Sequence, residues 1–553
     1  MTISERNDFM NTKMNSMRKL AAVMAVVSSV TSLTACGAAS TDEADSYTRG
    51  QNNVQYNSTE AAAGECAPAD YDEAPADNAD FEQNDEEYNY ISENGYTAVS
   101  SAPLSTFSAD VDTASYTNVR RMIDNGSDVP PDAVRIEEFI NYFDYDYTDP
   151  ADGEPFAVHT ELSDCPWNDE TELLMVGINT KGFDAVLDER PAMNLVFLID
   201  VSGSMYDDNK LPLVQKSFSM LTDNLTAADR VSIVTYAGSD EVVLEGADGN
   251  DRKQILKAID DLEAGGSTAG AAGITTAYEI AEKYFIDGGN NRVILATDGD
   301  LNVGLSSESE LTRLIEEKRE SGVFLSVLGF GTGNYKDNRL EALADYGNGN
   351  YSYIDSEKEA KKVLVDEMSG TLFTVAKDVK FQLEFNPANV KGYRLIGYEN
   401  RVMAAEDFND DTKDAGEIGA GHSVTVLYEI VPADSKMELG ESELKYASDS
   451  EGVMGDELLT VNIRYKEPEG SESKLLTYPV NKSLYSDKMS ADMNFASCVA
   501  EFGMLLRNSR YIGDVTYKDV SAQLSKYDYS DDDYKDEFIY LVNTMKRRDT
   551  NFQ

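Results

Sequence analysis

Three oxygen-bearing side chains follow an apolar run at alternate positions. The run from Leu195 to Ile199 contains only Leu, Val, Phe and Ile, and Asp200, Ser202 and Ser204 come directly after it. Such a run predicts a strand that is buried on both faces. Gly203 permits a tight turn because it has no Cβ. The turn can therefore aim one carboxylate and two hydroxyls at one point, and hard oxygen ligands of this kind suit Mg²⁺, Mn²⁺ or Ca²⁺.

Two later segments end in the same kind of side chain. A glycine-rich turn, Gly265-Gly-Ser-Thr268, presents a hydroxyl just before a helical stretch, and Asp298 follows the apolar strand from Val293 to Leu295. All three segments lie in connections between strands and helices. In an open parallel sheet, ligands bind at the edge formed by the carboxyl ends of the strands. The alternative for the first segment is a polar turn in which Ser204 or Asp208 caps a helix. The two further segments favour the metal site, because the motif comes with its structural context.

In this three-part form the chain resembles von Willebrand factor type A (VWA) domains. Their metal-ion-dependent adhesion site (MIDAS) uses Asp-x-Ser-x-Ser, a distal Thr and a distal Asp. The resemblance implies that a divalent cation, Mg²⁺ first and Mn²⁺ or Ca²⁺ as alternatives, is held by Asp200, Ser202, Ser204, Thr268 and Asp298. In that family one or both aspartates contact the metal through water, and one position stays open for a carboxylate. Mg²⁺ tolerates this arrangement because it keeps several waters. The implied function is metal-bridged binding of a protein partner through its Asp or Glu side chain, in adhesion or as an envelope-complex scaffold.

Periodicity along the chain predicts the fold class. From Ala192 to about Ala376, strand-like and helix-like runs alternate, which indicates an α/β fold with a doubly wound, mainly parallel sheet. After Val379 the apolar residues alternate as in antiparallel strands, and a β-sandwich is the expected packing. The strand-like segment from Phe156 to Ile178 is expected to join that sheet system, because neither strand group could bury a face alone. The VWA domain would then be an insertion between two β segments.

The chain of 553 residues is too long for one core and suggests several domains. The predicted order is a lipoprotein signal peptide (1–35), an acidic tether (36–102), an N-terminal VWA-associated region of helices then strands (103–190), the VWA domain (191–376), a β-sandwich-like region (377–485) and a C-terminal helical region (486–553).

The N-terminus has the features of a targeting segment. A basic flank precedes an apolar stretch from Leu20 to Leu33, and Leu33-Thr-Ala-Cys36 resembles a bacterial lipobox. That resemblance implies cleavage before Cys36, acylation of its sulfur and new amino group, and anchoring at the extracytoplasmic face of the bacterial cell membrane. An ordinary secretory signal is the alternative. The following segment, Gly37 to Ala98, carries Asp and Glu throughout with Arg49 as its only basic residue, which predicts a disordered spacer, with order beginning near Pro103.

Composition excludes some functions. The chain has 47 basic and 101 acidic residues and a net charge of −54, which argues against a nucleic-acid partner. The two histidines, His159 and His422, lie on predicted strands outside the VWA region, which argues against His-based zinc sites and Ser-His-Asp catalysis. We therefore expect that the protein is not an enzyme. The alternative is a metal-dependent or carboxylate-based envelope hydrolase.

Several other side chains could carry chemistry but favour a structural interpretation. Asp110 and Asp112 are interpreted as turn and cap residues rather than a metal pair, and the acidic segment from Asp407 to Glu417 as a solvated loop. Cys165 and Cys498 could form a disulfide, but two buried free thiols are the favoured interpretation.

Overall fold

The computed structural model describes residues 86–182, 190–266, 270–299, 308–333, 335–439, 455–468 and 470–552. The predicted signal peptide, Cys36, most of the predicted tether and Thr268 lie outside these ranges.

Six strands form the VWA sheet in the order β10-β9-β8-β5-β6-β7. Five are parallel, and β7 runs antiparallel to β6 at one edge. This arrangement confirms the predicted α/β class with a mainly parallel sheet. The bounds are β5 (Met193–Asp200), β6 (Arg230–Tyr236), β7 (Asp240–Asp248), β8 (Asn290–Thr297), β9 (Phe324–Phe330) and β10 (Tyr351–Ile354).

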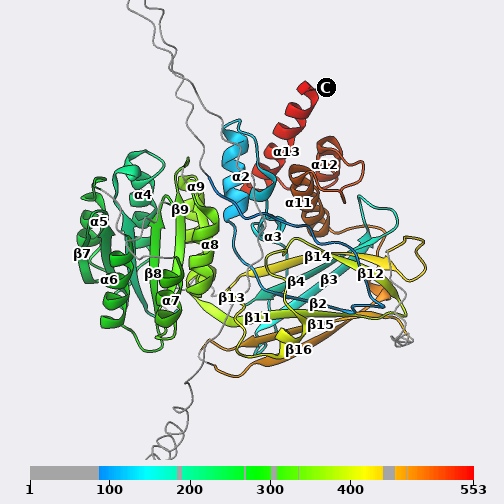
Figure 1. Ribbon diagram of the computed structural model, residues 1–553, viewed down its shortest axis with the longest axis horizontal. Helices are drawn as coiled ribbons and strands as arrows, with labels where there is room; N and C mark the ends of the chain where they lie inside the picture. The colour runs from blue at the N-terminus through cyan, green and yellow to red at the C-terminus, as the bar shows by residue number, and fades with distance from the viewer. Residues whose placement is uncertain are drawn as a thin grey trace, which may run out of the picture. The chain divides into compact units, whose positions relative to one another are not determined.

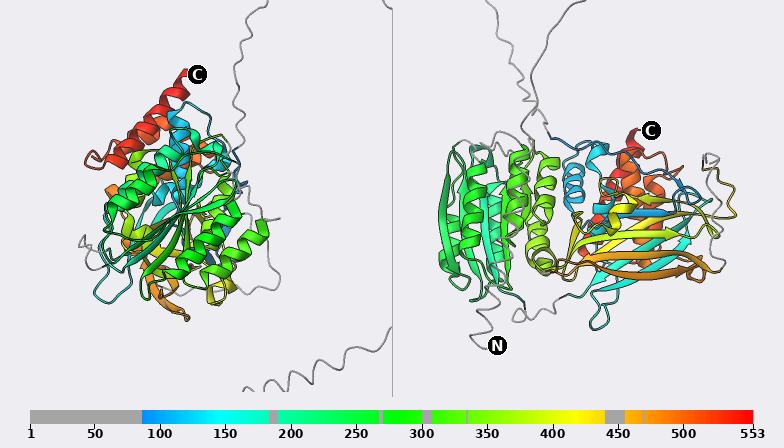
Figure 2. Two further views of the ribbon diagram at one scale, coloured as in Figure 1. Left: turned by 90° about the vertical axis from the view of Figure 1, so that its left-hand side faces the viewer. Right: turned by 60° about the horizontal axis from the view of Figure 1, so that its bottom comes forward.

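Helices cover both faces of this sheet (Figure 2). Every residue of β5 is buried, with Leu195 and Phe197 contributing to the core on one face and Val196 and Leu198 to the core on the other. Burial on both faces explains why β5 lacks a polar alternation. The helices of the first face are α4 (Leu211–Thr222), α5 (Arg252–Asp260), α9 (Glu357–Lys361) and α10 (Met368–Leu372), with a π turn, η4 (Lys362–Asp366). Those of the second face are α6 (Gly270–Lys283), α7 (Glu308–Arg319) and α8 (Asp337–Tyr346).

Two antiparallel sheets with a shared core form a second body (Figure 1). One has the order β1-β12-β14-β4-β3; the other has the order β13-β11-β15-β16, with β2 also paired to β11. The strands are β1 (Thr97–Ala98), β2 (Leu104–Ser108), β3 (Phe156–Asp164), β4 (Glu172–Thr180), β11 (Thr374–Phe385), β12 (Val390–Ile396), β13 (Gly416–Gly419), β14 (Ser423–Pro432), β15 (Glu457–Lys466) and β16 (Lys474–Asn481). Short 3-10 turns are η5 (Ala405–Asn409) and η6 (Lys482–Leu484).

Strand β4 pairs with β14 over eight positions, from Ser423 opposite Asn179 to Ile430 opposite Glu172. This pairing confirms that the segment from Phe156 to Ile178 joins the later β strands. The VWA elements therefore lie between β4 and β11 along the chain, as an insertion in this β frame.

The remaining helices share one hydrophobic core, and this core covers the outer face of the first antiparallel sheet. Leu173 and Met175 of β4 join the core of these helices, whereas Leu174 and Val176 point into the core between the two sheets. The elements are α2 (Ala114–Asp124), η1 (Pro131–Ala133), α3 (Ile136–Asn141), α11 (Ala491–Arg507), α12 (Tyr517–Leu524) and α13 (Asp533–Phe552). None of the helices in the described ranges has both the length and the apolar character to cross a membrane.

Residues 86–102 correct the predicted extent of the tether. They are folded: Glu86 forms an ion pair with Arg121 at 3.0 Å, β1 pairs with β12, and Val99 is 1% exposed. The segment has few aliphatic residues of its own, but α2 and β12 supply the surface that it covers. The prediction that order begins near Pro103 is therefore wrong.

Cys165 and Cys498 are both buried and unpaired, as predicted. Burial raises the pKa of each thiol above its ordinary value. A buried thiol that resists ionisation is a poor nucleophile, so these residues serve packing.

Candidate metal centre

Asp200 is the last residue of β5 and is fully buried. The backbone N–H of Ser202 donates to Asp200 Oδ1 at 2.9 Å, and Thr297 Oγ donates to Oδ2 at 3.3 Å. Burial raises the pKa of Asp200 to about 6 against the effect of these hydrogen bonds, and the charge of Asp298 adds to the rise. Two neighbouring carboxylates without full solvation favour a bound cation.

The two serine hydroxyls converge. Ser202 Oγ and Ser204 Oγ lie 2.9 Å apart, Ser202 is 2% exposed and Ser204 is exposed. The donor group is therefore anchored in the protein at Asp200 and opens to solvent at Ser204. This change from buried to exposed side chains suits an ion that is bound by protein ligands on one side and is accessible to a solvent or partner ligand on the other.

The second predicted segment lies directly against the first. Gly203 N donates to the Gly266 carbonyl at 3.1 Å, and Gly265 N donates to the Val201 carbonyl at 2.7 Å. A Cβ on Gly203 would lie 3.4 Å from the Gly266 oxygen, an ordinary van der Waals contact, so the two loops lie side by side without a clash. The structure thus brings the chain leading into Thr268 to the centre, and Thr268 itself lies outside the described residues.

Asp298 directly follows β8, the neighbour of β5, and is 4% exposed. Lys210 Nζ donates to Asp298 Oδ2 at 3.0 Å and to the Ser204 carbonyl at 3.0 Å. The sequence motif does not include Lys210, and its position at the start of α4 gives no signal of this contact.

The donor set fits a hard divalent cation. Two buried carboxylates, one at the end of β5 and one just after β8, and two hydroxyls are oxygen ligands of the kind that Mg²⁺ and Mn²⁺ prefer. Across the ranges the structure describes, no three His, Cys, Asp or Glu side chains are grouped closely enough to hold a metal. The loop from Asp200 to Ser204 adds two hydroxyls to its carboxylate.

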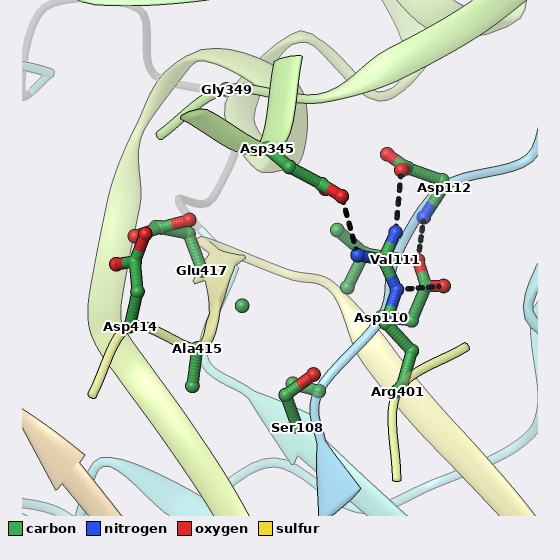
Figure 3. A pocket seen from close by; sticks show the side chains of 12 residues that line it. Ser108, Asp110, Val111, Asp112, Asp345, Gly349, Arg401, Asp414, Ala415 and Glu417 are labelled. Atoms are coloured by element: carbon green, nitrogen blue, oxygen red, sulfur yellow. Dashed lines mark hydrogen bonds and ion pairs between the residues drawn. The ribbon is translucent and has the colours of Figure 1, made fainter. Parts of the chain in front are cut away.

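A second cluster of charged residues surrounds Arg401 at a cavity of about 160 Å³ (Figure 3). Arg401 forms ion pairs with Asp110 at 2.9 Å, Asp345 at 2.6 Å, Glu341 at 3.3 Å and Asp112 at 3.4 Å. Glu341 and Asp345 belong to α8 of the VWA domain, and the other partners precede α2. This cluster ties the VWA insertion to the β frame.

The structure refines the interpretation of Asp110 and Asp112. The backbone N–H of Asp112 donates to Asp110 Oδ1 at 2.9 Å, as in a polar turn, and Asp112 Oδ1 accepts from Tyr351 N at 2.8 Å. Both carboxylates also pair with Arg401, which sequence spacing alone does not indicate. Burial and the neighbouring charge of Asp110 raise the pKa of Asp112 well above its ordinary value.

Comparisons with known proteins identify the parts of the chain. The profile described as von Willebrand factor type A domain matches residues 194–366. The profile described as von Willebrand factor matches residues 82–175, and the profile described as the C-terminal part of the uncharacterized protein YfbK matches residues 370–547. The uncharacterized protein YfbK of Escherichia coli K12 is 45% identical over 467 residues, which cover 82% of this chain and 80% of that protein. This chain belongs to the YfbK family.

Similarity to solved structures is more distant. A von Willebrand factor type A protein from Catenulispora acidiphila is 17% identical with a TM-score of 0.38, and the match covers 63% of this chain and 80% of that one. Proximal thread matrix protein 1 from the mussel byssus, with a zinc-occupied MIDAS motif, is 23% identical with a TM-score of 0.27, and the match covers 32% and 45%. The sequence profile confirms the predicted VWA domain. This member of the YfbK family is therefore a VWA-domain protein.

Proposed function

We propose that the chain binds a divalent cation, Mg²⁺ first, and through it a carboxylate of a protein partner. The proposed ligands are Asp200, Ser202, Ser204, Thr268 and Asp298. The observation that carries the proposal is the pair of serine hydroxyls, 2.9 Å apart, beside the buried carboxylate of Asp200. When bound, the ion would supply an electron-poor centre that accepts an outside acid group, because neutral hydroxyls neutralise little of its charge. VWA domains mediate protein interactions, which supports recognition as the role of this centre.

Recognition rather than catalysis is the proposed chemistry. His159 belongs to β3 and His422 precedes β14, so both lie on the β frame instead of the VWA sheet. Ser202 therefore lacks a histidine base within the centre. Hydrolysis of cell-wall polymers by the purified protein would favour the alternative, an envelope hydrolase.

A decisive test removes one carboxylate at a time. We expect Asp298→Asn and Asp200→Asn each to weaken Mn²⁺ binding, measured by isothermal titration calorimetry, by about 10- to 100-fold, as loss of a metal-orienting group does. Asp261→Asn removes an exposed carboxylate just after α5, and this variant should bind Mn²⁺ like wild type. Unchanged affinity in both centre variants, or no Mn²⁺ binding by the wild-type protein, contradicts the metal site. Capture of a partner from envelope extracts should likewise disappear in EDTA.

Membrane anchoring is a separate proposal. It is supported by Leu33-Thr-Ala-Cys36, which resembles a lipobox. The acylated chain would stand at the extracytoplasmic face of the bacterial cell membrane. We expect cells expressing the full chain to incorporate labelled palmitate into it, and Cys36→Ala to abolish the label and release the protein from the membrane fraction. A membrane-bound Cys36→Ala variant would overturn the proposed anchor.

A further inference from the structure

Lys210 places a buried ammonium group between two loops of the candidate metal centre. Its side chain is 9% exposed, and that of Asp298 is 4% exposed. Nζ reaches both Asp298 Oδ2 and the Ser204 carbonyl at 3.0 Å. The ammonium therefore joins the loop after β5 to the loop after β8.

The stem of Lys210 lies in a place that the backbone leaves open for it. Gly331 follows β9 with φ +75°, and a Cβ added there would lie 2.5 Å from Lys210 Cε and 2.7 Å from Cγ. Glycine adopts this left-handed conformation at no steric cost and has no side chain to block the stem. The close fit keeps the ammonium at the centre rather than free in solvent.

We propose that Lys210 is a fixed internal cation that weakens binding of the metal ion and strengthens binding of an anionic partner to the metal-loaded centre. The proposal rests on the proposed function above. Asp200, Asp298 and Lys210 together carry one negative charge when ionised, so a divalent ion leaves the centre with one positive charge. Without Lys210 the loaded centre would be neutral and would attract a carboxylate less.

The same contacts give Lys210 a role in the metal-free protein. Asp298 is buried beside Asp200, and a positive partner offsets its charge while no ion is bound. The lysine also fixes the Ser204 carbonyl, and with it the turn that presents the two hydroxyls. Lys210 thus preorganises the centre and at the same time competes electrostatically with the ion.

The test compares Lys210→Met and Lys210→Gln with two controls. Lys210→Arg keeps the charge, and Lys216→Met removes an exposed charge from the same helix, where Lys216 pairs with Glu357. Mn²⁺ affinity is measured by calorimetry, and acetate serves as the carboxylate probe through its displacement of Mn²⁺-bound water, followed by water-proton relaxation. Both neutral variants should bind Mn²⁺ roughly tenfold tighter, because a unit charge a few ångströms away has an effect of at least this size. Acetate should bind their Mn²⁺-loaded forms several-fold more weakly, and their melting temperature in EDTA should fall.

The outcomes separate this inference from the proposed function. Wild-type protein that binds no Mn²⁺ overturns both. Wild-type binding together with equal or weaker Mn²⁺ affinity in the folded neutral variants overturns only the role of Lys210. If both neutral variants fail to fold even in saturating Mn²⁺ while Lys210→Arg folds, the lysine is a structural cation, and the proposed control of affinity is wrong.

Discussion

Replacing Arg401 by methionine is expected to lower the free energy of unfolding by about 3–5 kcal/mol at pH 8, as loss of one partner from a buried ion pair does. Four carboxylates, from Asp110, Asp112, Glu341 and Asp345, pair with this guanidinium, whose side chain is 13% exposed. Methionine fills much of the volume but leaves these acids without their shared cation. The docking of α8 against the β frame should therefore weaken.

The free energy of unfolding that Arg401→Met removes should be smaller at pH 5 than at pH 8. Burial raises the pKa of Asp112 and of Glu341 above their ordinary values, so these acids take up protons readily when the cation is removed. Urea unfolding at both pH values measures the effect. Arg230→Met is the matched control, because Arg230 pairs with Asp248 at an exposed site, where an ion pair contributes about 0–1 kcal/mol. Equal losses in the two variants would show that the Arg401 cluster does not hold the VWA domain in place.

Ionisation of the buried Glu501 carboxyl should lower the free energy of unfolding as pH rises from 6 to 8.5. Its side chain is 2% exposed on α11, and burial raises its pKa to about 8. The unfolded chain has a glutamate pKa of about 4.3. Between these values the folded state binds one proton more than the unfolded state, so stability falls with rising pH by up to about 1.4 kcal/mol per pH unit. The contribution is fully present below about pH 4 and is lost as pH passes about 8.

Other buried acids act in the same direction. The pKa of Glu138 is raised to about 8 and that of Glu137 to about 7, with burial as the main cause of both. We expect Glu501→Gln to reduce the stability difference between pH 6 and pH 8.5 by about 2–3 kcal/mol, because the amide cannot ionise. The exposed Glu263→Gln should leave that difference unchanged. The same pH dependence in Glu501→Gln and wild type would show that this carboxyl ionises freely in the folded protein.

Local sequence patterns predicted the elements that build the candidate centre. The apolar run before Asp200 is a buried central strand, and Asp298 follows its neighbour in the sheet. Both predictions depend on residues that are adjacent along the chain, where periodicity and glycine determine the local conformation. That the segment from Phe156 to Ile178 joins the later β strands was also predictable, since isolated strands cannot bury their apolar faces. Its pairing with β14 is known only from the structure.

Helix α8 shows where such patterns fail. Its buried face mixes Asp337 and Glu341 with Leu340, Leu343 and Ala344, so an apolar stripe alone does not define that face. Arg135 pairs with Asp337 at 2.5 Å, and this partner comes from a distant segment. Polar residues can be buried only where such partners meet them.

The sequence by itself determined the α/β class, the insertion of the VWA domain and the positions of Asp200, Ser202, Ser204 and Asp298 at strand ends. These features follow from the order of apolar and polar residues over short stretches. Only the tertiary structure decided that Lys210 reaches Asp298 and that Arg401 reaches Asp110, which is 291 residues away along the chain. Ion pairs of this kind have no local signature, because they depend on which surfaces come together when the two bodies fold.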